Sequence, residues 1–157
     1  MKRLLLQGIF AGGLSAALCT PLFAHATQSD DKVGIRHVMM KTWDKPQTPL
    51  DVGPITVLAD HAVAGWTQDG RGGRALLTKR VDGQWHVTAC AGDVLKDAKT
   101  LAMTGMSASM ARQLAQMIAS NEALLSPQRR AMFSTFDGMV RMDSEGMHQS
   151  HVQGEKH

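Results

Sequence analysis

The segment from Ile55 to Cys90 most constrains the fold, because it alternates short β-favouring runs with turn sequences. Its strongest turn signal is Asp82-Gly83, which stands between two such runs and favours a tight hairpin with both residues at positive φ. We therefore predict a four-stranded antiparallel β-meander. The expected strands cover residues 55–58, 62–66, 74–81 and 85–90, and residues 68–73 are expected to form a loop.

Helical patterns flank the predicted sheet on both sides. Residues 32–43 place Val33, Met40 and Trp43 at helical spacing. After Gly92 the sequence is helical again, with Ser107 or Ser109 as a possible helix cap and Ser126-Pro127 as the start of a further helix. The predicted fold class is α+β: an N-terminal helix, the four-stranded meander, and C-terminal helices packed on one face of the sheet.

The first 26 residues have the pattern of a secretory signal peptide. Lys2 and Arg3 precede an apolar run over residues 4–18, and Ala24-His25-Ala26 supplies the small residues that signal peptidase recognises. The run is shorter than the ~20 apolar residues that a membrane-spanning helix needs. We expect cleavage after Ala26 and a periplasmic location.

Cleavage would leave a single α+β domain over residues 27–142 and a C-terminal tail over residues 143–157. The tail carries too little apolar surface to offset the entropy of ordering it, so it is predicted to be flexible. Removing Lys2 and Arg3 lowers Lys+Arg from 17 to 15, against 14 Asp+Glu. This near-neutral balance argues against a nucleic-acid partner.

Cysteine usage excludes paired-cysteine chemistry. Cys19 would leave with the signal peptide, so Cys90 remains alone and no intramolecular disulfide can form. We expect Cys90 to be a buried core residue. Strict alternation along residues 85–90 predicts that Cys90 shares a sheet face with His86, opposite Trp85.

No enzyme signature is present in the sequence. Gly-x-Ser-x-Gly and His-Glu-x-x-His are absent, and no histidine and asparagine pattern accompanies the cysteine. Arg71-Gly-Gly-Arg74 could bind an anion, but a solvated loop is the simpler interpretation because no phosphate-loop lysine and helix start follow it. The chain is therefore predicted not to be an enzyme.

The C-terminal end gathers soft and borderline metal ligands. Thioethers suit Cu(I) and imidazoles suit Cu(II), so copper is the predicted metal. The candidate ligands are Met139, Met142, Met147, His148 and His151. Core packing is the alternative role for the first two, and a solvated spacer is the alternative for the other three.

A second set of methionines falls at helical spacing: Met103, Met106, Met110 and Met117. The simpler interpretation of this set is a core-facing stripe. Gly105 and Ser107 indicate that the helix begins only after Met106.

Several sequence blocks carry a family resemblance: Trp43-Asp-Lys-Pro46, the segment Val52 to Asp60, Ala64-Gly-Trp66, Gly70-Arg-Gly-Gly-Arg-Ala-Leu-Leu77, Trp85-His-Val87, Cys90-Ala-Gly92 and Phe136-Asp-Gly138. They resemble the small exported bacterial proteins of the copper uptake system-associated protein family. The resemblance covers most of residues 30–142 and leaves the tail outside. It implies a genomic association with copper import and supplies no catalytic residues.

The resulting hypothesis is a periplasmic, non-enzymatic accessory protein of copper uptake or homeostasis. Its expected partners are copper ion and a copper-uptake membrane transporter or a periplasmic copper protein. One alternative is a periplasmic protein-interaction module that never touches metal. Another is a small-molecule-binding domain, since a helix leading into a meander is also similar to nuclear-transport-factor-like domains; such a pocket would need polar groups such as Asp60, His61 or His86.

Overall fold

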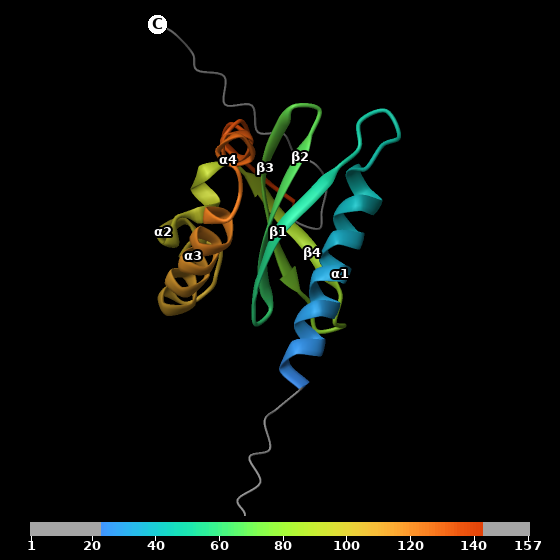
Figure 1. Cartoon of the computed structure of the whole chain (residues 1–157). Coiled ribbons are helices and arrows are strands. Elements are labelled where there is room, and N and C mark those ends of the chain that lie inside the picture. The colour runs from blue at the N-terminus through green and yellow to red at the C-terminus, as the bar shows by residue number, and fades with distance from the viewer. Residues whose placement is uncertain (1–22, 143–157) are drawn as a thin grey trace, which may run out of the picture.

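The computed structural model describes residues 23–142, in which an antiparallel sheet has helices on both faces (Figure 1). Within these residues the sheet has five strands in chain order, so each strand pairs with its sequence neighbour. The predicted α+β class is confirmed, whereas the predicted four-stranded meander lacks the fifth strand. The elements are α1 Phe23–Trp43, β1 Asp51–Leu58, β2 His61–Gln68, β3 Arg71–Lys79, β4 Trp85–Ala91, the 3-10 helix η1 Asp93–Lys96, α2 Ala98–Ala102, α3 Ala108–Ala123, α4 Pro127–Phe133 and β5 Met139–Arg141.

Helix α1 begins at Phe23 rather than at residue 32, because no proline or glycine interrupts the chain before Gly34. It therefore runs across the predicted cleavage point after Ala26. Over the described residues, no helix combines the length and the apolar character that crossing a membrane requires.

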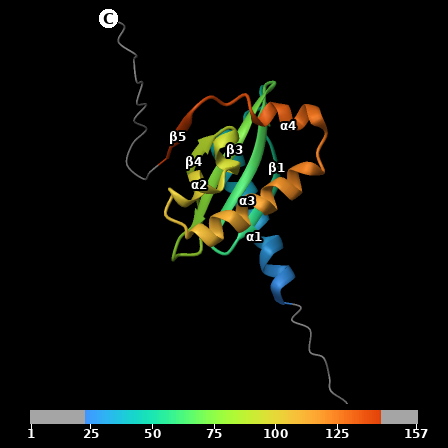
Figure 2. The ribbon, with the colours of Figure 1, turned by 90° about the vertical axis from the view of Figure 1, so that its left-hand side faces the viewer.

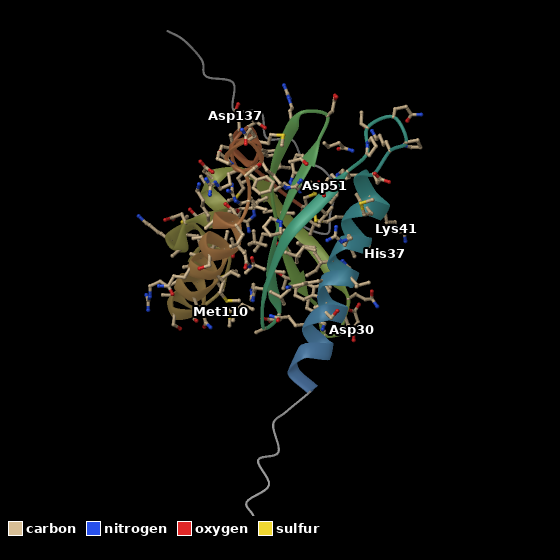
Figure 3. All side chains as sticks on the ribbon, viewed as in Figure 1. Asp30, His37, Lys41, Asp51, Met110 and Asp137 are labelled. Carbon is tan, nitrogen blue, oxygen red and sulfur yellow. The ribbon has the colours of Figure 1, made fainter. Side chains whose placement is uncertain are left out.

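The buried face of α1 agrees with the predicted one in part, because Met40 and Trp43 pack against the core but Val33 does not. Ile35 and Met39, one helical turn apart, are fully buried against the sheet, whereas Val33 is 67% exposed. The opposite side of the helix carries exposed polar residues, including His37 and Lys41 (Figure 3). The buried face of α1 is set by its contact with the sheet.

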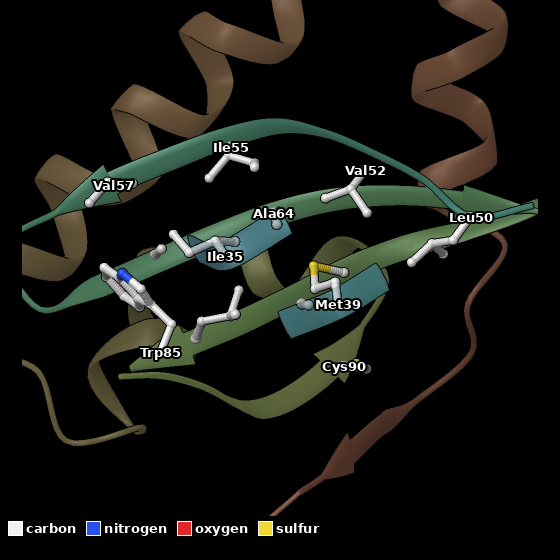
Figure 4. Packing of buried hydrophobic residues seen from close by; sticks show 12 residues of the cluster. Ile35, Met39, Leu50, Val52, Ile55, Val57, Ala64, Trp85 and Cys90 are labelled. Carbon is white, nitrogen blue, oxygen red and sulfur yellow. The ribbon is translucent and has the colours of Figure 1, made fainter. Parts of the chain in front are cut away.

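One hydrophobic core lies between α1 and the sheet (Figure 4). Polar contacts fix the helix over it. The carboxylate of Asp31 accepts hydrogen bonds from Lys79 Nζ at 2.6 Å and from Trp85 Nε1 at 3.0 Å. The fully or nearly fully buried members of this core are Ile35, Met39, Leu50, Val52, Ile55, Val57, Ala62, Ala64, Ala75, Leu77, Trp85 and Cys90.

A second core lies on the other sheet face, beneath α2 and α3 (Figure 2). Ser107 caps α3 by accepting a hydrogen bond from Met110 N, and Ser126 caps α4 with Pro127 in the first turn. Both predicted caps are thus confirmed. Helices α1 and α3 therefore lie on opposite faces of the sheet, and a separate hydrophobic core lies beneath each of them.

The turns of the meander use the two Asp-Gly pairs differently from the prediction. Asp69 and Gly70 both have positive φ, 51° and 71°, and join β2 to β3 as a two-residue hairpin turn. At the predicted hairpin, only Gly83 has positive φ, and Arg80 N bonds to Gln84 O across a three-residue loop. The hairpin at Gly83 is confirmed, but the expected two-residue turn lies at residues 69–70.

The predicted loop over residues 68–73 is mostly strand. Gly72 and Gly73 belong to β3, where Gly72 N donates to Thr135 Oγ1 at 3.0 Å. A Cβ on Gly72 would lie 2.5 Å from the carbonyl oxygen of Trp66, and one on Gly65 would lie 2.6 Å from Phe133 Cζ. Gly65 is required because α4 lies directly on β2, and Gly72 is required because the carbonyl oxygen of Trp66 on the neighbouring strand leaves no room for a Cβ.

A β-bulge in β4 redirects its last residues. Leu76 pairs with Ala89 and Leu77 pairs with Val87, so Thr88 is an extra residue in β4. After this bulge Cys90 lies on the α1 face together with Trp85. The prediction that Cys90 shares a face with His86 is therefore wrong, because strict alternation cannot anticipate a bulge.

Candidate functional site

An apolar cavity of about 190 Å³ lies at one end of the core beneath α1. The end of α1, the connector before β1, strands β2 and β4, and the segment around β5 all contribute to its wall. Figure 4 shows Met39, Leu50 and Cys90 toward this end of the core, away from Trp85. The lining residues are Met39, Trp43, Leu50, Trp66, Cys90, Phe136, Val140 and Met142.

Three of these lining residues carry sulfur, and each comes from a different element. Met39 lies on α1 and is 1% exposed, and Cys90 lies on β4 and is 6% exposed. Met142 follows β5 and is partly buried against the same core. Its backbone N–H donates to Thr88 O at 2.8 Å, which holds this end of the chain against β4. Two thioethers and one thiol thus share one cavity.

The thiol of Cys90 is held in its neutral form. Burial raises the pKa of Cys90 from 9.0 to about 12, because the apolar surroundings disfavour the thiolate. Cys90 is therefore a poor nucleophile at neutral pH, which agrees with the expected core role. It is a free cysteine within the described chain.

The structure separates the two predicted ligands that it describes. In β5, Met139 and Val140 point to opposite faces of the sheet, and Met142 follows the Val140 side. Met142 accordingly lines the cavity, while Met139 lines a groove on the face of α2. The remaining predicted ligands, Met147, His148 and His151, lie outside the described residues.

The groove on the α2 face exposes two thioethers. It has a volume of about 480 Å³ and runs between α2, β3, β4 and β5. Met139 is 38% exposed in its wall, and Met103, at the end of α2, is 76% exposed. Threonine side chains of β3, β4 and α2 line the same groove, so it is more polar than the cavity.

His61 and His86, on β2 and β4, are separated by β3. Across residues 23–142, no group of three or more His, Cys, Asp or Glu side chains is placed to hold an ion. His61 and His86 pair with Thr78 from its two sides, so they are two strand spacings, about 10 Å, apart. Neither they nor Asp60 lines the apolar cavity, so the polar pocket proposed for a small-molecule domain is not found there.

The second arginine of the Arg-Gly-Gly-Arg motif is buried in an ion pair. Arg74 is 1% exposed and bonds to the carboxylate of Glu122. Because its guanidinium is already neutralised, the motif offers no paired-arginine anion site. Arg71 remains exposed at the start of β3.

Comparison of the chain with protein-family models, with curated proteins and with solved structures finds no match in any of the three.

The cavity could not be predicted from local sequence patterns, because it forms by contacts between distant segments. Met39 could have been found from the spacing Ile35, Met39, Trp43, which is a regular i, i+4, i+8 stripe. The place of Cys90 depends on the bulge, and that of Met142 on the pairing of β5 with β4. Neither has a local sequence signal.

Proposed function

We propose that the chain is a periplasmic, non-enzymatic accessory protein of copper uptake or homeostasis. In this proposal it binds copper through thioether and imidazole side chains near its C-terminal end and passes the ion to a copper-uptake membrane transporter or a periplasmic copper protein. The proposed ligands are Met139, Met142, Met147, His148 and His151.

The observation that carries the proposal is the exposure of Met139. A methionine that only packs the core would be buried, whereas Met139 is 38% exposed beside the more exposed Met103 in one groove. Exposed thioethers are soft ligands that bind Cu(I) better than hard cations. The strand that carries Met139 leads directly to residues 143–157, which supply the further sulfur and imidazole donors.

The proposed periplasmic location follows from the signal-peptide pattern at the N-terminus. It can be tested with the protein preparation that is also used for the copper titrations. The full-length chain would be expressed with its own N-terminus and purified from the periplasmic fraction. N-terminal sequencing should begin at Thr27. Recovery of the chain only from the cytoplasm would contradict export.

Copper binding would be measured on this exported protein by anaerobic Cu(I) titration and aerobic Cu(II) titration against competing chelators. A triple variant with alanine at Met147, His148 and His151 is expected to lose most Cu(II) affinity, because it removes the imidazoles of the proposed site. The matched control carries alanine at the neighbouring positions Gln149, Ser150 and Val152 and should bind as the native chain does.

The outcomes separate the competing hypotheses. Unchanged binding of both copper ions in the triple variant would show that residues 147–151 are not ligands. No competitive binding by the native chain would contradict the copper proposal and favour a protein-interaction module.

A further inference from the structure

We infer that the apolar cavity beneath α1 is a site for one Cu(I) ion, bound by the thioethers of Met39 and Met142 and by the sulfur of Cys90. This inference rests on the proposed function, because it names a site and an oxidation state for the same cargo. It adds Met39 and Cys90, which lie on the opposite sheet face from Met139.

The donor set that the described residues give the cavity is soft. Among residues 23–142, the lining side chains are apolar, aromatic or sulfur-bearing, and none is a carboxylate, an amide or an imidazole. Thioether and thiol sulfurs favour Cu(I) over Mg²⁺ or Ca²⁺, which require oxygen ligands. The cavity volume of about 190 Å³ leaves room for the two methionines to turn inward, since each side chain has three rotatable bonds.

The charge of the three donor side chains favours a monovalent ion in this apolar cavity. A charge moved into an apolar interior is costly unless an opposite charge accompanies it. When Cu(I) binds Cys90, a Cu–S bond forms, the S–H bond breaks, the proton leaves to water, and copper stays in the +1 state. Cu⁺ with one thiolate and two thioethers is neutral, whereas Cu²⁺ or Zn²⁺ with the same donors keeps a net positive charge.

Binding is expected to depend on pH because the thiolate is the sulfur form that ligates a metal, so the ion displaces the thiol proton of Cys90 and binding strengthens as pH rises. The buried ion pair of Arg74 and Glu122 lies on the other face of the sheet, beneath α3. In the part of the chain that the structure describes, no titratable side chain other than Cys90 lines the cavity wall.

The cavity wall reaches solvent at Val140 and Met142. Val140 lines the cavity and is 43% exposed, and Met142 beside it is only partly buried. Met142 is therefore the donor closest to solvent, and Met39 and Cys90 form the inner end. In the sequence, Met142 comes shortly before the further proposed donors at residues 147–151.

The test uses the exported full-length chain carrying alanine at Met147, His148 and His151, so that only the folded part can bind. Cu(I) is titrated anaerobically with a competing chelator, Ag(I) serves as a redox-inert probe, and tryptophan fluorescence is recorded because Trp43 and Trp66 line the cavity. We expect one ion per chain, one proton released per ion, quenched fluorescence, and no binding of Zn²⁺.

Three variants in this background should each weaken Cu(I) binding by about tenfold or more: Met39→Leu, Met142→Leu and Cys90→Ala. The two leucine substitutions conserve volume and should leave the fold intact. The matched control is Met117→Leu on α3, which lines neither the cavity nor the groove of Met139 and should bind as the background does.

Other results would contradict the cavity site, and they also show whether the proposed copper function fails with it. Binding that survives Met142→Leu and Cys90→Ala would remove the cavity site and leave the proposed copper function standing. No Cu(I) binding by the background while the native chain binds would assign copper to residues 147–151 only. If neither the background variant nor the native chain binds copper, the proposed function itself is contradicted. If the cavity binds the apolar dye anilinonaphthalene sulfonate and no metal, it is a site for apolar ligands.

Discussion

Arg74 and Glu122 form a two-point ion pair between β3 and α3. The guanidinium Nε and Nη2 atoms donate to the two carboxylate oxygens of Glu122, each at 2.7 Å. Both side chains are buried, at 1% and 7% exposure. Arg74 also bonds to Asp93 Oδ1 at 3.2 Å, and its guanidinium lies 5.4 Å from the ring centroid of Phe133. One arginine thus holds α3, η1 and α4 against the sheet.

Replacing Glu122 by alanine is expected to destabilise the fold by about 3–5 kcal/mol, because the buried guanidinium would lose its main counter-charge. The free energy of unfolding would be measured by urea titration. Asp51→Ala is the matched control, since it removes an exposed ion pair with Arg129 and should cost only about 0–1 kcal/mol. An equal loss in the free energy of unfolding for the two variants would show that the buried ion pair stabilises the fold no more than the exposed one does.

Two glycine-to-alanine substitutions should have opposite effects on stability. Gly65→Ala would place a Cβ 2.6 Å from the ring of Phe133, so Phe133 and α4 must move, at a cost of about 1–3 kcal/mol. Gly34→Ala lies inside α1, where the nearest atom would be at an ordinary 3.5 Å, and should stabilise by up to about 1 kcal/mol. Thermal unfolding of both variants checks the contrast. A stabilising Gly65→Ala would mean that α4 does not pack as described.

Local signals predicted much of the fold, and the structure shows why they succeeded. Ser107 and Ser126 satisfy backbone N–H groups within their own first helical turns, so each cap depends only on neighbouring residues. The hairpin at Gly83 likewise closes over a few residues. These features require no knowledge of the rest of the chain.

The candidate site could not be predicted in the same way, because each of its parts depends on distant contacts. The bulge at Thr88 moves Cys90 to the α1 face, and β5 forms only by pairing with β4. Arg74 resembles a loop arginine in sequence, and Glu122, which neutralises it, is far along the chain. The sequence therefore indicates Met139 and Met142 as candidate ligands but not their separation onto two sheet faces.

Removing the α3 cap should cost about 1 kcal/mol. Ser107 accepts a hydrogen bond from Met110 N at 3.2 Å, and Ser107→Ala would leave that N–H without this partner at the start of the helix. The control is Ser120→Ala on the exposed face of the same helix, where alanine has the higher helix propensity and stability should be unchanged or slightly increased. Urea unfolding measures both, and a loss at Ser120 as large as at Ser107 would contradict the assigned cap.

Cys90 should make the fold less stable in alkaline solution. Burial raises the pKa of its thiol from 9.0 to about 12, so between these values the unfolded chain loses the proton and the folded chain keeps it. The unfolded state then binds fewer protons than the folded state, and the free energy of unfolding falls as pH rises through this window. Below pH 9 the thiol is protonated in both states and contributes no slope.

The measurement is urea unfolding of the exported chain at a series of pH values from about 7 to 11, beside Cys90→Ala. The chain contains no tyrosine, and its lysines are the same in both proteins, so the difference in slope reports the thiol alone. The native chain should lose stability more steeply than the variant above pH 9. Identical slopes would mean that the thiol is not desolvated by folding, and would remove the charge argument for a monovalent ion in the cavity.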